Sequence, residues 1–209
     1  MSLSSIRLYP NCLHSDDCIF FSNSDATINK ILANLSESFT LEDQGTVQDY
    51  LGIQITKDPV SQSIHMTQPS LIESVLRDLH LSPESKTKDT PSVGILYPDH
   101  DGFPHQDSWN SCSVVGKLNY IAQNTRPDIS FAIHQCARYS AQPTALHELA
   151  VKQIGRYLLA THDNGIIMHH NFKLDMYVAG MWHCDYSELC ECALSRTGYI
   201  ITYCGCPIH

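Results

Sequence analysis

Several features that define common protein classes are missing from this 209-residue sequence. No apolar run approaches the roughly 20 residues of a membrane-spanning helix. The N-terminus also lacks the charged-then-apolar layout of a secretory signal. The ten glycines are scattered, so the sequence has no glycine-rich phosphate loop, and no serine lies in a nucleophile-elbow context. We therefore expect no membrane segment, and the two best-known loop motifs of enzyme sites are absent.

Positive charge is scarce as well. The chain has 13 Lys and Arg against 22 Asp and Glu, which gives a formal net charge of −9. This balance argues against non-specific nucleic-acid binding by the chain as a whole. Residues 111–160 differ, because five basic side chains there accompany only two acidic ones, Asp128 and Glu148. The basic side chains are Lys117, Arg126, Arg138, Lys152 and Arg156.

Cysteine is plentiful, with nine residues. Without a secretory signal these cysteines suggest a reducing compartment, so we expect an intracellular location, cytoplasmic or nuclear. Five of them lie between Cys184 and Cys206, near His183. The pairs Cys190/Cys192 and Cys204/Cys206 could offer four sulfurs to zinc, although Cys-x-Cys is not the usual zinc spacing. Pairs of this spacing on strands have a second explanation, because they simply share one face of a sheet.

The stretch at residues 11–21 (NCLHSDDCIFF) predicts a strand, a tight turn and a strand, with Asp16 and Asp17 at the tip. Two adjacent carboxylates repel each other. They are explained either by a solvated turn or by a divalent metal such as Mg²⁺, which takes oxygen ligands. Residues 24–38 then predict a helix that covers this hairpin, with Ser24 as its N-cap. Its apolar stripe is Ile28, Ile31, Leu32 and Leu35.

Further elements follow in the pattern. Residues 50–56 and 63–66 predict two strands separated by a turn at Pro59. A helix follows, capped by Thr67 with Pro69 in its first turn, and its stripe is Leu71, Val75, Leu76 and Leu79. Residues 82–110 contain four prolines and two glycines, so they predict a linker or, as we favour, an extended strap over the surface.

Three helices are expected between residues 107 and 160. Asp107 or Ser108 would cap the first, Arg126-Pro127 would start the second, and Thr144 would start the third. The inward faces would carry Val114, Leu118 and Ile121, then Ile129, Ala132, Ile133 and Cys136, then Leu149, Ile154, Tyr157 and Leu158. Glu148, Lys152 and Arg156 step by four on the opposite face of the third helix. Residues 165–170, 174–178 and 196–204 predict three closing strands.

Several motifs occur in an order that resembles the reverse transcriptase of copia-type long-terminal-repeat retrotransposons. SDDCIFFS at residues 15–22 resembles the aromatic-x-Asp-Asp hairpin of that family. Matching segments follow: DYLGIQI at 49–55, VGKLNY at 115–120, TRPDI at 125–129, HELAVK at 147–152, RYL at 156–158 and SRTGY at 195–199. Together these segments span nearly the whole chain.

The resemblance implies an α+β fold in four parts. Residues 1–81 would hold part of the polymerase palm, namely its hairpin and helix, followed by the primer-grip hairpin and the start of the thumb. Residues 82–110 would be the strap or linker, and residues 111–163 the thumb and connection helices. Residues 164–209 would be a short, truncated three-stranded RNase H-like sheet. From the residues alone, the hairpin at 50–66 is equally explained as a plain core-edge hairpin.

The resemblance also implies a chemistry. Polymerases use two Mg²⁺ ions about 3.5–4 Å apart, and here Asp16 and Asp17 would be the catalytic metal ligands. A further aspartate would come from an upstream palm strand that these 209 residues do not contain, and the fingers would also lie upstream. His14 stands where the family usually has an aromatic residue. We therefore expect a reverse transcriptase fragment without the N-terminal polyprotein segments, inactive by itself and holding Mg²⁺ weakly.

The partner that the resemblance implies is an RNA/DNA template-primer, with no membrane. Lys117, Arg126, Lys152 and Arg156 would bind its phosphates, although a basic helix face can also be merely solvated. Related sequences read YVDADFAG in the first RNase H strand, whereas this chain reads YVAG at 177–180, as if four residues had been lost. Asp175 and Asp185 do not fall at the matching place, so no hybrid cleavage is expected. The alternative function is a non-catalytic nucleic-acid-binding or structural module.

Overall fold

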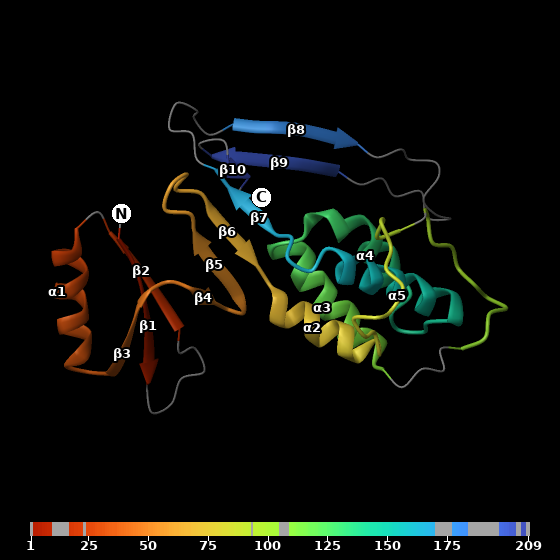
Figure 1. The fold of residues 1–209 in the computed structure, drawn as a ribbon, viewed down its shortest axis with the longest axis horizontal. Helices are drawn as coiled ribbons and strands as arrows, with labels where there is room; N and C mark the ends of the chain where they lie inside the picture. The colour runs from red at the N-terminus through yellow and green to blue at the C-terminus, as the bar shows by residue number, and fades with distance from the viewer. Residues whose placement is uncertain are drawn as a thin grey trace. The chain divides into compact units, whose positions relative to one another are not determined.

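Antiparallel strands and five α-helices share the described part of the chain, so the fold is α+β (Figure 1). The computed structural model describes residues 2–9, 17–22, 24–92, 94–104, 109–169, 177–183, 197–203 and 206–207. The chain divides into two units, Met1–Thr56 and Lys57–His209.

The first unit is built on a three-stranded sheet. β1 (Ser2–Tyr9) pairs antiparallel with β2 (Asp17–Ser22) on one side and with β3 (Thr40–Thr46) on the other, in the order β2-β1-β3. α1 (Asp25–Ser36) follows β2 and contacts both β2 and β3. An antiparallel strand pair followed by a helix is therefore confirmed. The placement of Asp17 at the tip was wrong, because Asp17 belongs to β2 and pairs with Arg7. Asp16 lies outside the described residues, and β3 lies in a stretch where the sequence pattern predicted no strand.

The ends and the buried face of α1 differ from the expectation in detail. Ser24 occupies the N-cap position with an extended backbone, but its side chain makes no capping hydrogen bond. Its backbone N–H donates instead to Ser22 Oγ at 3.1 Å. Within the predicted stripe Ile28 is buried, whereas the side chain of Ile31 is 40% exposed. The predicted helix is therefore present, but its apolar stripe is less deeply buried than the sequence pattern indicated.

A tight two-residue turn shifts the next strand. β4 (Asp49–Tyr50) pairs with β5 (Ile53–Lys57), with Tyr50 opposite Ile53. The two turn residues, Leu51 and Gly52, both have positive φ, of 51° and 76°. Positive φ at both positions is typical of the hairpin turn whose twist matches its strands. The predicted strand at 50–56 therefore begins later, at Ile53.

The turn after β5 is held by Asp58. Its backbone N–H donates to the carbonyl of Ser63 at 3.0 Å, and β6 (Ile64–Thr67) follows. The Asp58 carboxylate accepts hydrogen bonds from the Ser61 hydroxyl and the Val60 N–H, and these lower the pKa of Asp58. β6 pairs with β7 (Ile166–Met168). The two strands expected around Pro59 are present.

The core of the second unit lies among its helices. These are α2 (Pro69–Asp78), α3 (Ser111–Asn124), the short 3₁₀ turn η1 (Pro127–Ile129), α4 (Ser130–Ala137) and α5 (Ala145–Ala160). Their buried apolar side chains form one cluster, which includes Ile72, Leu79, Leu118, Ile121, Ile129, Ile133, Ile154 and Leu158. The inward faces predicted for α3 and α4 are confirmed. On α5 the prediction is wrong for Leu149, whose side chain is 61% exposed.

Two predicted helix caps need correction. The N-cap of α2 is Gln68, because Thr67 still belongs to β6, and Pro69 is the first helical residue. The N-cap of α3 is Asn110, whose side chain accepts a hydrogen bond from the Ser113 N–H at 2.9 Å. Asp107 and Ser108, which the sequence favoured, lie outside the described residues. Thr144 is the N-cap of α5, as predicted.

The segment between α2 and α3 runs along α4 and α5. Residues 82–92 and 94–104, here called the strap, contain no helix or strand beyond the isolated bridge of Pro104 with Thr144. The Leu96 N–H donates to Gln135 Oε1 at 3.3 Å, and Tyr139 Oη donates to the Leu96 carbonyl at 3.3 Å. Leu96 also packs against the helical core. The strap is therefore held to the helices by backbone hydrogen bonds as well as by apolar contact.

The closing strands are arranged differently from the prediction. β8 (Tyr177–His183), β9 (Thr197–Tyr203) and β10 (Cys206–Pro207) form a sheet in the order β10-β9-β8. The strand predicted at 165–170 is β7, which pairs with β6, so its assignment to this closing sheet was wrong. Gly165 explains the pairing, because a Cβ there would collide with the backbone of Met66. Only glycine allows such a close approach of two backbones.

Candidate functional site

The predicted catalytic pair is described only in part. Asp16 lies outside the described residues, and Asp17 is the first residue of β2, in register with Arg7 of β1. Among the described residues no group of three or more His, Cys, Asp or Glu side chains could hold a metal ion. Of the cysteines proposed for zinc, only Cys206 is described, and it is buried in β10. The Mg²⁺ site at Asp16 and Asp17 stays a prediction.

The first predicted phosphate-binding residue, Lys117, joins two helices. Its ammonium group lies 2.7 Å from Asp78 Oδ2 and donates to Ser74 Oγ at 2.9 Å, so it connects α3 to α2. The Lys117 side chain remains 31% exposed. Its charge is therefore balanced by a carboxylate, yet a partner at the surface could still reach it.

Arg126 is the second predicted residue, and it lies in the interior with 2% of its side chain exposed. Its Nε and Nη2 atoms donate to the Asp128 carboxylate at distances of 2.7 to 3.3 Å. The Nη1 atom donates to the Thr161 carbonyl, and Nη2 also donates to Thr161 Oγ1. These contacts assign Arg126 to holding the end of α5. A buried cation with these bonds is not placed to meet a phosphate.

Asp128 and Tyr157 complete this network. Tyr157 Oη donates to Asp128 Oδ2 at 2.7 Å, and the Arg126 guanidinium lies over the Tyr157 ring at 5.4 Å from its centre. Burial raises the pKa of Asp128, but the hydrogen bonds from Arg126 and Tyr157 outweigh it and hold that pKa below its usual value. The same hydrogen bond to Asp128 raises the pKa of Tyr157.

The two remaining predicted residues, Lys152 and Arg156, lie on α5. Lys152 Nζ is 2.7 Å from Glu148 Oε1, and these side chains are only 23% and 16% exposed. The strap lies close by, since the Lys88 N–H donates to the Arg156 carbonyl at 3.3 Å. Arg156 Nε is buried without a hydrogen-bond partner among the described residues. The face that the sequence predicted to be open is therefore half-buried.

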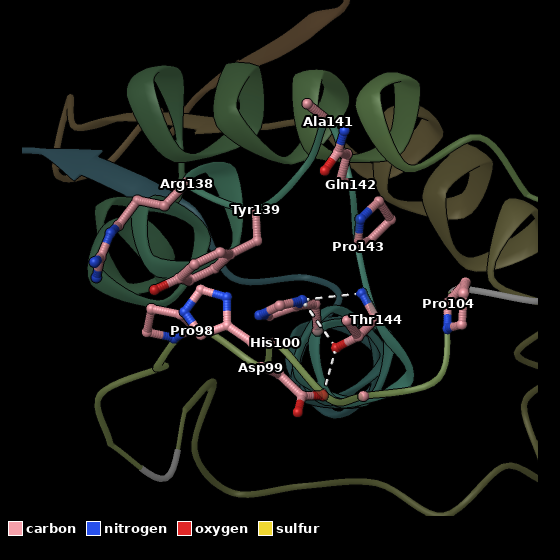
Figure 2. A pocket seen from close by; sticks show the side chains of 12 residues that line it. Pro98, Asp99, His100, Pro104, Arg138, Tyr139, Ala141, Gln142, Pro143 and Thr144 are labelled. Atoms are coloured by element: carbon pink, nitrogen blue, oxygen red, sulfur yellow. Dashed lines mark hydrogen bonds between the residues drawn. The ribbon is translucent and has the colours of Figure 1, made fainter.

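A cavity of about 820 Å³ lies between the strap and the connection of α4 to α5 (Figure 2). Its wall includes Asp99 and His100 from the strap and Arg138, Tyr139 and His147 from the helices. In the sequence Arg138 belongs to a basic region, but no pattern there indicated this cavity. Asp99 meets Thr144 across 45 positions of sequence, and no local pattern carries such a pairing.

The wall of the cavity is held by the N-terminus of α5. His147 Nδ1 accepts a hydrogen bond from the Thr144 backbone N–H at 3.0 Å, which forms one half of a capping box. With Nδ1 accepting, the neutral imidazole carries its proton on Nε2, which lies 3.3 Å from the Tyr97 carbonyl. Both imidazole nitrogens therefore have partners within the fold, and His147 is buried. These contacts place His147 where it holds the N-terminus of α5 against the strap.

No helix among the described residues is both long and apolar enough to span a membrane.

Several known proteins are similar to this chain over most of its length. No protein-family model matches the chain, and no solved structure is significantly similar to it. An uncharacterized mitochondrial protein of Arabidopsis thaliana, AtMg00810, is 29% identical over 196 residues, which are 94% of this chain and 79% of that protein. The retrovirus-related Pol polyprotein from transposon TNT 1-94 of Nicotiana tabacum is 30% identical over 92% of this chain.

The Pol polyprotein from transposon RE1 of Arabidopsis thaliana is 27% identical over 90% of this chain. The chain spans 15% of the tobacco polyprotein and 13% of the RE1 polyprotein. These similarities extend over almost all of the chain, and they agree with the motif order described above. The chain is therefore a homologue of part of the retrovirus-related Pol polyproteins of copia-type transposons.

Proposed function

We propose that this chain is the C-terminal part of a retrotransposon reverse transcriptase, followed by the start of an RNase H domain, and that it contacts the template-primer without catalysing by itself. The observation that carries the proposal is the 30% identity over 92% of the chain to a Pol polyprotein of which it spans 15%. A segment this small relative to the polyprotein would supply only some parts of a polymerase.

The arrangement of elements is compatible with this assignment. The β1–β2 pair, with Asp17 at the start of β2 and α1 beside it, would be the palm hairpin and its helix. The turn at Asp58 would belong to the primer grip, and α3 to α5 would be the thumb and connection. In that assignment Asp16 and Asp17 would contribute to a Mg²⁺ site, together with a carboxylate from outside these 209 residues.

A second candidate, a non-catalytic structural module, is favoured by the ion pairs of the helical unit. Lys117, Arg126 and Lys152 each have a carboxylate partner at 2.7 Å. The Lys117 pair joins α3 to α2, and all three pairs reduce the charge left for phosphates. Arg156 has no ion pair among the described residues, and it is the strongest remaining candidate for a phosphate contact on α5.

Binding to a fluorescein-labelled RNA–DNA hybrid, measured by fluorescence anisotropy over a range of salt concentrations, separates the two candidates. A template-primer partner predicts salt-dependent binding that weakens when Arg156 and Lys152 are replaced by Gln. Removing one side chain that binds a phosphate should lower the slope of log K against log salt by about 0.9 on a duplex. Arg77→Gln, an exposed charge on α2, is the matched control. Equal weakening in control and test variants, or no binding at all, would favour the structural module.

Catalysis is tested separately on the purified 209-residue chain. Labelled nucleotide incorporation on a primed template with Mg²⁺ or Mn²⁺ should stay at background, because the remaining metal ligand and the fingers of the family lie outside these residues. Incorporation that Asp16→Asn abolishes would contradict this expectation.

Cleavage of an RNA–DNA hybrid should also be absent. The register of β8 against β9 shifts between Val178 and Gly180, so one residue of β8 bulges where the family motif has its Asp-Ala-Asp-Phe. The pairing of β8 with β9 is therefore interrupted at this point. Restoring DADF after Val178 in this chain should still give no Mg²⁺-dependent cleavage, because the other carboxylates of the family lie beyond residue 209. Cleavage by the unaltered chain would point to Asp175 or Asp185 as a metal ligand.

A further inference from the structure

Five side chains form a continuous series of contacts along the wall of the cavity between the strap and α4–α5. The Arg138 guanidinium lies over the Tyr139 ring, 5.1 Å from its centre. The Tyr139 ring stacks on His147, with ring centres 4.2 Å apart and an interplanar angle of 11°. His147 Nδ1 bonds the Thr144 backbone, and Thr144 Oγ1 donates to Asp99 Oδ2 at 2.8 Å. Figure 2 shows Arg138, Tyr139, Thr144 and Asp99 of this series around the cavity.

The two ends of the series have opposite character. Arg138 donates from Nη1 to Gln135 Oε1 at 3.2 Å, and it has no acidic partner among the residues that the structure describes. At the other end Asp99 uses Oδ2 for Thr144, while Oδ1 has no hydrogen-bond partner in the described part of the chain. The cavity therefore presents unused guanidinium donors at one end and a carboxylate acceptor at the other.

Part of the cavity wall is closely packed, and other lining residues are exposed to solvent. A Cβ at Gly102 would collide with the Asp99 carboxylate, so glycine at this position leaves room for that carboxylate. Pro98, Pro104 and Pro143 line the cavity with rigid apolar surface. Pro98, Pro104, His100 and Gln142 are exposed to solvent. The volume of about 820 Å³ falls in the range of ligand sites, roughly 300–1,000 Å³.

We propose that this cavity binds one ribonucleotide unit of a single-stranded RNA, with its phosphate on Arg138 and a ribose hydroxyl donating to Asp99. The proposal rests on the function proposed above, and it adds a single-strand site separate from the duplex contacts of Lys152 and Arg156. An arginine with unused donors is well suited to a phosphate, and the prolines offer apolar surface to the base. The carboxylate selects RNA, because the 2′-hydroxyl is the donor that distinguishes RNA from DNA.

The charge of the site also explains why a single nucleotide is favoured over a run of phosphates. Asp99 would repel a second phosphate placed at its end of the cavity, so the site accommodates one anionic group and one donor. A free nucleotide carries the same chemistry as a nucleotide within a strand. Competition by adenosine monophosphate distinguishes these two sources.

The test uses the full 209-residue chain and a fluorescein-labelled single-stranded oligoribonucleotide, followed by anisotropy at several salt concentrations. Arg138→Gln should weaken binding about tenfold and lower the salt slope by about 0.7, the value for one phosphate on a single strand. Asp99→Asn should remove the preference for RNA over the same sequence in DNA. Arg77→Gln is the matched charge control and should change binding less than about twofold. Circular dichroism of each variant verifies that the helices remain.

Each outcome bears on the proposal. Equal weakening in Arg77→Gln and Arg138→Gln would mean diffuse attraction and would overturn the site. Unchanged RNA preference in Asp99→Asn would overturn the ribose contact. Stronger binding of adenosine monophosphate than of the oligoribonucleotide would assign the cavity to a free nucleotide instead. Hybrid binding that persists while the single strand fails to bind would reject this inference alone, whereas the disappearance of all nucleic-acid binding would reject the proposed function as well.

Discussion

The helix of the first unit and the helices of the second unit have similar sequence patterns but different environments. α1 has an apolar stripe at helical spacing, yet Ile28 is its one buried side chain. α3 has a comparable stripe and buries six residues, and α5 buries five. The difference lies in the neighbours, because α1 contacts β2 and β3, whereas α3 and α5 contact other helices and α5 also contacts the strap. A stripe therefore predicts which face turns inward, and the partner determines how deeply it is buried.

The buried network adds a second contrast. In the helical unit a single segment, Thr125 to Asp128, connects three elements. Thr125 Oγ1 donates to Gln68 Oε1 at 2.8 Å at the start of α2, and Arg126 bonds Thr161 at the end of α5. Polar groups as buried as these stabilise a fold only when they are paired. This part of the family motif accordingly has a structural explanation in the present fold.

The largest expected effect comes from removing a core side chain of the helical unit. Leu118→Ala should lower the free energy of unfolding by about 3 kcal/mol, because Leu118 is 0% exposed and the substitution leaves a cavity. Ile31→Ala in α1 should stay within about 0.5 kcal/mol, as for surface positions. Urea unfolding followed by circular dichroism measures both. Similar decreases for the two variants would remove the contrast between the two environments.

A smaller effect is expected at the buried ion pair. Asp128→Asn leaves the Arg126 guanidinium buried without a negative partner, and it should cost about 2 kcal/mol, below the usual range because the Asp128 side chain is 38% exposed. Asp128→Glu keeps the charge and serves as the control. Urea unfolding at neutral pH measures both variants, and an unchanged midpoint in Asp128→Asn would show that Arg126 does not need this partner.

The same pair predicts a pH dependence with a definite sign. The pKa of Asp128 lies below its ordinary value of 3.8 in the folded chain. Its contribution to stability is therefore fully present above pH 3.8 and is lost as the pH falls through the lower, folded value. Asp128→Asn should lack this part of the acid sensitivity. Unfolding midpoints measured from neutral pH down to about pH 2 compare the two chains, and parallel curves would contradict the assignment.

The sequence was most informative where a pattern is local. Helical spacing located α1 to α5 within a few residues, and every residue predicted to face inward on α3 and α4 is buried. It was least informative where distant segments meet. The pairing of β7 with β6 depends on Gly165 lying against Met66, and the cavity at Asp99 depends on contacts across 45 positions. Burial of Arg126 was also missed, because its guanidinium is held inside by Thr161, which lies 35 positions away in sequence.

The smallest expected effect compares helix caps in the two units. Asn110 accepts a hydrogen bond from the Ser113 N–H at 2.9 Å, so Asn110→Ala should lower the free energy of unfolding by about 1 kcal/mol. Ser24 occupies the same position in α1 without a side-chain capping bond, so Ser24→Ala should change stability by only a few tenths of a kcal/mol. Sequence preference treats the two residues alike, because both serine and asparagine favour the N-cap.

Asn110→Asp and Ser24→Asp are useful controls, since a carboxylate can accept the same bond and is favoured by the helix dipole. Asn110→Asp should retain stability, and Ser24→Asp should raise it if an unused capping position is present. Urea unfolding of the four variants measures the differences, and equal decreases for the two alanine substitutions would show that position alone, without the observed hydrogen bond, determines the contribution of a cap.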